Sequence, residues 1–164
     1  MNTYNPAFMQ RAITLSQEAY TSGKGLPIGC VIVKNNQIIG EGHNEIFMRK
    51  NPTAHGEMVA IEDACKQLNN ILLEDCELYT TLEPCPMCFS AIYWAKIKCV
   101  YYACTNVDAS AVGFDDSFIF EQMQKPNSEQ LIPMIHFKET KAFEVLQSWK
   151  NLEQDAAQPW QDKI

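Results

Sequence analysis

The sequence predicts an α/β fold of three layers, α-β-α, with a mixed central sheet of about five strands and helices on both faces. Two observations lead to this prediction. The pair Asn35-Asn36 separates two runs rich in β-formers, which indicates an antiparallel hairpin. The order strand, helix, strand over residues 76–103 indicates a right-handed parallel crossover. Antiparallel and parallel pairs in one chain make the sheet mixed.

The predicted elements can be justified in chain order. Asn5-Pro6 is a plausible cap and first position for a helix, and the Gly-containing run 22–25 ends it. A polar, irregular loop over 44–52 leads to a second helix that begins at His55 and runs out near Asn69-Asn70. The other expected elements are strands at 30–33, 37–40, 76–80, 98–103 and 133–137, and helices from Cys85, over 114–120 and over 140–154.

Length and composition indicate one domain. The chain has 164 residues, of which 46% are apolar, and this suits a single core. We expect one catalytic domain over 1–154. The tail 155–164 has one tryptophan, Trp160, in largely polar surroundings, and we expect it to be mobile unless it docks on a partner subunit.

The charge and the cysteines bear on partners and location. A net charge of −7 repels phosphate backbones, so we expect a small uncharged substrate and no nucleic acid. Seven scattered cysteines do not form a disulfide framework. The chain has no signal peptide and no apolar run of membrane-spanning length. We therefore expect a cytoplasmic protein without membrane contact.

The segment Pro84-Cys85-Pro86-Met87-Cys88 offers two thiols at the start of a helix. Pro86 suits the first helical position, and Cys85 and Cys88 then project from the same turn. The positive end of the helix dipole favours thiolates, which are the form that binds metal. Two sulfurs alone leave a zinc ion half-coordinated.

His55-Gly56-Glu57 supplies candidates for the rest of the site. Three ligands, His55, Cys85 and Cys88, would leave the fourth position of a tetrahedral zinc open, as a catalytic zinc requires. Glu57 need not bind the metal and can move a proton as a general acid and base. H-x-E followed by P-C-x-x-C is the signature of zinc nucleobase deaminases.

Each of these residues also has an ordinary structural explanation. The cysteines could form a structural zinc knot or a redox pair, although only one histidine and two cysteines stand at motif spacing. Glu57 could be a first-turn acid of its helix. The remaining cysteines, at 30, 65, 76, 99 and 104, are expected to pack in the core, and Trp94 and Trp149 also suit core positions.

Beyond the zinc motif, the chain resembles the guanine deaminases of the cytidine-deaminase fold over roughly residues 5–149. The similarity includes Ala91-Ile92-Tyr93-Trp94-Ala95 and the segment Gly113-Phe114-Asp115-Asp116-Ser117-Phe118. The second segment is the one typical of the guanine branch. The resemblance implies hydrolysis of guanine to xanthine and ammonia, one Zn²⁺ and a homodimer.

The same resemblance implies substrate contacts. Asn44 would hydrogen-bond the base, Asp116 would read the purine edge, and Ile28 and Trp94 are candidates for the walls of the pocket. A loop role for Asn44 and helix capping by Asp115 and Asp116 remain alternatives. The guanine enzymes tend to have Pro-Phe-Gly where this chain has Pro27-Ile28-Gly29, so an aromatic wall is replaced by an aliphatic one.

Other functions stay open at this point. Guanosine is the nearest alternative substrate, followed by cytosine-type and triazine rings. A tRNA adenosine deaminase would need basic residues to hold phosphates, and the sequence has no such cluster. A non-catalytic zinc module would not need Glu57.

Overall fold

The computed structural model describes residues 4–149. These residues fall into two compact units, with the boundary between Phe120 and Glu121. The predicted single domain over 1–154 stays a prediction, and the tail 155–164 with Trp160 lies outside the described residues. The first unit contains the sheet and the predicted site.

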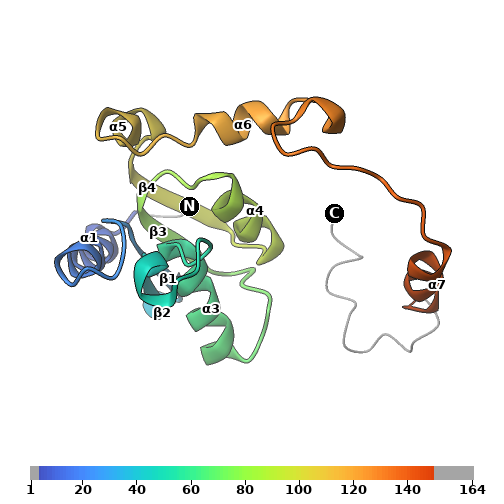
Figure 1. Cartoon of the computed structure of the whole chain (residues 1–164). Helices are drawn as coiled ribbons and strands as arrows, with labels where there is room; N and C mark the ends of the chain where they lie inside the picture. The colour runs from blue at the N-terminus through green and yellow to red at the C-terminus, as the bar shows by residue number, and fades with distance from the viewer. Residues whose placement is uncertain (1–3, 150–164) are drawn as a thin grey trace. The chain divides into compact units, whose positions relative to one another are not determined.

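The described elements follow one another as helices α1 to α7, strands β1 to β4 and one 3₁₀ turn (Figure 1). In chain order they are α1 (Pro6–Thr21), β1 (Gly29–Lys34), β2 (Gln37–His43), α2 (Ile46–Arg49), α3 (Gly56–Leu68), β3 (Glu77–Leu82), α4 (Pro86–Trp94), β4 (Cys99–Cys104), α5 (Asn106–Ala111), α6 (Ser117–Met123), η1 (Asn127–Glu129) and α7 (Thr140–Trp149).

The sheet is mixed, as predicted. Its strand order is β2-β1-β3-β4. β1 pairs antiparallel with β2, where Gly29 faces His43, and antiparallel with β3, where Cys30 faces Thr80. β3 and β4 are parallel and are joined through α4, which is the predicted crossover.

Helices cover both faces of this sheet, and the side chains of β1 divide between them with a period of two (Figure 1). Val31 and Val33 pack with Tyr79 against α1. Cys30 and Ile32 point to the other face, where the core continues into α3 and α4. The predicted three-layer arrangement is therefore confirmed.

Glycine in β2 allows α3 to lie very close to the sheet. A Cβ atom placed on Gly42 would come within 2.3 Å of the Gly56 carbonyl oxygen and 2.4 Å of the Ala60 nitrogen. No side chain fits in that space, because these neighbours are helix backbone. The glycine thus places the N-terminus of α3, and with it the candidate ligand His55, directly beside the end of β2.

Local signals in the sequence account for several element ends. The Asn5 side chain accepts a hydrogen bond from the Ala7 N–H and caps α1. Asn35 and Asn36 have φ of 50° and 61°, the left-handed values that a two-residue hairpin turn needs. Asn69 ends α3 in the left-handed conformation.

Two short helices were missed. α2 lies inside the loop 44–52, and α5 follows β4. The signal for α5 was readable, because Thr105 and Asp108 form a capping box with reciprocal hydrogen bonds. The predicted helix over 114–120 begins later, at Ser117. The Ser117 N–H donates a hydrogen bond to the Asp115 side chain at 2.9 Å.

The predicted fifth strand over 133–137 is wrong, since within residues 4–149 the sheet has four strands. A strand needs a partner for its backbone groups, and this segment has none among the described residues. Its apolar side chains are instead open to solvent, with Ile135 82% and Phe137 89% exposed.

The expected burial of β4 and of two tryptophans is also wrong. β4 is an edge strand whose second half is exposed, so Cys104 is exposed and Cys99 only half-buried. Trp94 and Trp149 are each about half exposed. The local sequence of β4 is that of a buried strand, but its position at the sheet edge leaves it uncovered.

The second unit consists of the end of α6, the η1 turn, an extended segment and α7. α7 has no buried residue, although Phe143, Val145 and Leu146 are apolar. Across residues 4–149, each helix is too short or too polar to span a bilayer.

Candidate active site

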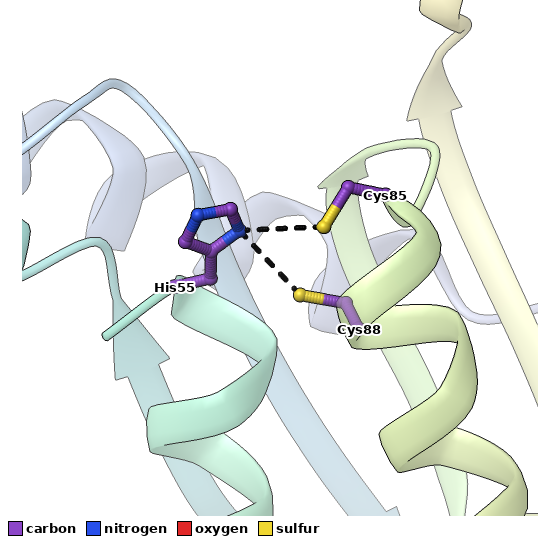
Figure 2. A group of neighbouring side chains, drawn as sticks. All are labelled: His55, Cys85 and Cys88. Carbon is purple, nitrogen blue, oxygen red and sulfur yellow. Dashed lines mark hydrogen bonds between the residues drawn. The ribbon is translucent and has the colours of Figure 1, made fainter. Parts of the chain in front are cut away.

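Two helix N-termini carry the predicted metal ligands. His55 is the N-cap residue of α3 and has extended backbone angles, so its side chain stands at the helix end. Cys85 is the N-cap of α4, Pro86 takes the first helical position, and Cys88 lies in the same turn. Figure 2 shows the three side chains pointing toward one another from these two helix ends.

The distances within this triad fit a tetrahedral zinc ion. His55 Nδ1 lies 3.6 Å from Cys85 Sγ and 3.6 Å from Cys88 Sγ (Figure 2). All three ligand atoms lie within 4.8 Å of one another. Zn–S bonds of about 2.3 Å and Zn–N bonds of about 2.0 Å, at tetrahedral angles, place sulfur and nitrogen about 3.6 Å apart. The residues present therefore fit zinc, with one coordination position left over.

The two thiols differ in protonation. A hydrogen bond from the Cys88 side chain lowers the pKa of Cys85 to about 4. The same hydrogen bond, together with burial, raises the pKa of Cys88. The hydrogen bond to Cys85 also raises the pKa of His55. His55, Cys85 and Cys88 share protons through these hydrogen bonds. A metal ion can take the place of those protons.

Glu57 lies beside the triad, in the first turn of α3. Its side chain is buried, at 2% exposure. Oε1 accepts a hydrogen bond from the Thr80 hydroxyl at 3.0 Å, and Oε2 lies 3.5 Å from Cys88 Sγ. Burial raises the pKa of this carboxyl, and the Thr80 hydroxyl opposes that shift. The carboxylate is therefore close to the metal ligands without being one of the triad.

A cavity of about 440 Å³ opens onto these groups. It brings together five predicted site residues. These are Ile28, His55, Glu57, Cys85 and Asp116. Burial raises the pKa of Asp116, and the nearby Cys85 adds to the effect.

Asn44 is placed differently. It is fully buried and does not line the cavity. Its Oδ1 accepts a hydrogen bond from the Leu26 N–H at 3.0 Å, and its NH₂ group remains available as a donor. That Nδ2 atom is buried and has no hydrogen-bond partner among residues 4–149. An unpaired buried donor is costly, so it indicates a missing acceptor.

Trp94 lies at the C-terminal end of α4, away from the cysteines at the other end of that helix. It does not line the cavity in this chain. Its predicted substrate contact remains a prediction.

Sequence reasoning missed several residues that line the cavity, above all Glu83 and Phe114. Glu83 stands two residues before Cys85, and its Oε2 accepts from the Asn106 N–H at 3.0 Å. This bond links the zinc-motif loop to the start of α5. The position of Glu83 directly before the zinc motif could be seen in the sequence, but its hydrogen bond with Asn106 could not.

Residues 3–104 match the cytidine and deoxycytidylate deaminase zinc-binding region. The chain belongs to this deaminase family. It is 48% identical over 144 residues to a guanine deaminase of Bacillus subtilis, covering 88% of this chain and 92% of that protein. The resemblance to guanine deaminases and the cytidine-deaminase-like fold are thereby confirmed.

One solved structure and one further relative are also similar to the chain. A solved structure of guanine deaminase from Bacillus subtilis superposes with a TM-score of 0.89 at 45% identity, covering 93% of this chain and 97% of the other. A tRNA-specific adenosine deaminase of Aquifex aeolicus is 44% identical over 96 residues, 58% of this chain and 63% of that protein. The deaminase is thus a zinc aminohydrolase, and His55, Cys85 and Cys88 are the triad that fits its metal.

The first prediction concerns the metal. The purified deaminase should contain about one zinc per chain, and Cys88→Ala should contain almost none, because it removes one of three protein ligands. Elemental analysis measures both. Cys76→Ala is the matched control, since Cys76 is equally buried but lies outside the triad, and it should keep its zinc. Full zinc content in Cys88→Ala would contradict the assignment of this ligand.

Proposed function

We propose that this deaminase hydrolyses guanine to xanthine and ammonia. The observation that carries the proposal is the shared cavity, which is lined by two residues of the zinc triad, His55 and Cys85, and by the carboxyl groups of Glu57 and Asp116. The guanine deaminase of Bacillus subtilis, alike over nearly the whole chain, supports it further. Each group then has a distinct part in the reaction.

Glu57 is proposed as the proton carrier. A zinc ion held by the triad lowers the pKa of a water molecule and so supplies a nucleophile at neutral pH. The Glu57 carboxylate, buried beside the ligands, takes a proton from that water and passes it to a ring nitrogen of guanine. The hydroxide that remains adds to C2 of guanine. Glu57 then takes the proton of that new hydroxyl group and delivers it to the amino group on C2, so that the C2–N bond breaks and ammonia leaves. One carboxyl therefore serves as base and acid in turn.

Asp116 and Asn44 are proposed to select the base. The Asp116 carboxylate would accept hydrogen bonds from the N–H groups on the purine edge. A ring without those N–H groups cannot supply these bonds. The unpaired NH₂ of Asn44 would donate to an acceptor of the base, which accounts for a buried donor that otherwise has no partner. Ile28 would give the ring an apolar wall without aromatic stacking. Because Trp94 does not line the cavity of its own chain, it would contact the substrate only in the site of a neighbouring subunit.

Two features favour a free base over transfer RNA. The net charge of −7 disfavours binding of a phosphate backbone. Of the cavity-lining residues, none is a lysine or arginine. Guanosine remains the second candidate among small substrates, because a site that reads the base edge does not by itself reject the ribose.

We also propose a homodimer, in which a second copy covers apolar surface that this chain leaves open. The edge strand β4 pairs only with β3, so its outer edge is unpaired within residues 4–149, and the extended segment 131–137 has no strand partner among these residues. Leu131, Ile132 and Ile135 are each 80% exposed or more, which is unusual for a stable monomer. A cytoplasmic location is proposed because all seven cysteines are free thiols.

The second prediction concerns the substrate. Guanine should release ammonia, while guanosine, cytosine, a triazine and transfer RNA should release much less under the same conditions. Glu57→Gln should keep its zinc and lose at least about 10²-fold in kcat, the usual contribution of a general acid–base. Editing of transfer RNA with guanine inert would refute the proposed function, and an active Glu57→Gln would refute the proton carrier.

The third prediction separates a substrate contact at Asp116 from helix capping. Asp116→Asn replaces a charged acceptor by an amide, and losing such a hydrogen bond costs about 1.5–3 kcal/mol, or roughly tenfold to a hundredfold in kcat/KM for guanine. Asp115→Asn is the control, because Asp115 accepts from the Ser117 N–H and asparagine caps almost as well. A loss below about threefold in Asp116→Asn, with zinc and Tm unchanged, would assign Asp116 to a structural role.

The fourth prediction tests the homodimer. Sedimentation should show a dimer for the wild type, and Ile135→Asp should shift it toward monomer, because a buried unpaired charge at the contact is costly. Ile71→Asp is the control, an exposed isoleucine in the loop after α3 that should leave the dimer intact. A wild-type monomer at micromolar concentration would contradict this proposal.

A further inference from the structure

Two neighbouring threonines on β3 are both buried but face opposite sides of the sheet. Thr80 points to the α3 side, and its hydroxyl donates to Oε1 of Glu57 at 3.0 Å. Thr81 points to the α1 side, and its hydroxyl accepts from the Gly29 N–H at 3.1 Å. One threonine thus contacts the buried carboxyl of the site, and the other contacts only backbone.

The Thr80 hydroxyl distinguishes the two oxygens of Glu57. Oε1 is held by Thr80, while Oε2 lies on the side of the metal ligands, 3.5 Å from Cys88 Sγ. A carboxylate held at one oxygen keeps the other oxygen in a defined direction. Without that bond, rotation about the last side-chain torsion of Glu57 is broad, because this torsion has weak preferences.

Thr80 itself is well fixed. It sits in the middle of the sheet, opposite Cys30 on β1 and Tyr102 on β4. Its branched Cβ restricts its own rotamers. Thr80 does not line the cavity, and its side chain is connected to the site by its hydrogen bond to Glu57.

We propose that Thr80 is a positioning residue, which holds Glu57 so that Oε2 faces the reacting groups during proton transfer. This inference rests on the proposed role of Glu57 in guanine hydrolysis. Proton transfer requires the donor and acceptor atoms to be within hydrogen-bond reach, so loss of alignment slows the chemical step. It should leave binding of the base largely unchanged, because the proposed contacts to the base come from Asp116 and Ile28, which lie on other segments of the chain than Thr80 and Glu57.

The test is Thr80→Val, which removes the hydroxyl and keeps the branched shape. We expect kcat for guanine to fall about tenfold or more, the equivalent of one hydrogen bond to a charged group, with KM within about twofold. Zinc content should stay at the wild-type value. A pair that differs only in the hydroxyl, Thr80→Ser and Thr80→Ala, provides the same comparison if the valine variant folds poorly, and the serine variant should have the higher kcat by about tenfold.

Thr81→Val is the matched control, because it removes a hydroxyl from a residue of the same strand that is also buried. It should lower Tm through the unpaired Gly29 N–H and keep kcat within about threefold of wild type. Equal losses of kcat in the two valine variants, or equal kcat in the serine and alanine variants, would overturn the positioning role. A wild type inert toward guanine would instead refute the proposed function, and the two failures are therefore distinct.

Discussion

The site depends on the close approach of two helix N-termini beside β3. α3 reaches this position because Gly42 leaves room for its first turn against β2. α4 reaches it because the strand β3 ends at Leu82 and the chain turns at once into Pro86. The positive ends of both helix dipoles then point toward one small volume, which favours the thiolates that bind a metal. The other candidate site residues in the cavity, such as Glu57 and Asp116, line it together with His55 and Cys85 from these helix ends.

Charge and burial constrain the residues around the triad. Two thiolates offset the charge of a zinc ion, so the metal site itself is close to neutral. Glu57 adds a further carboxyl at 2% exposure, which is costly unless it is hydrogen-bonded. Thr80 meets that requirement from the sheet side. The hydrogen bond that makes the buried carboxyl tolerable is also the one that orients it.

The zinc ligands and the wall proposed to select the base come from different segments of the chain. Residues 3–104 match the cytidine and deoxycytidylate deaminase zinc-binding region, and they include the whole triad. Phe114 and Asp116 lie beyond that region and line the same cavity as His55 and Cys85. Under the proposed function, the matched region holds the metal and the segment after β4 contributes to the choice of base.

The sequence alone determined the features that depend on near neighbours. The Asn35-Asn36 turn, the Asn5 cap and the zinc ligands at two helix starts follow from local spacing and backbone preference. Only the tertiary structure decided the contact between Thr80 and Glu57, which lie 23 residues apart, and the placing of Glu83 against α5. The segment 133–137 has the residue pattern of a strand but does not form one. The residues of β4 are typical of a buried strand, but β4 lies at the edge of the sheet. The reason is that pairing and burial depend on which partner is present, and a strand's own residues do not specify that partner.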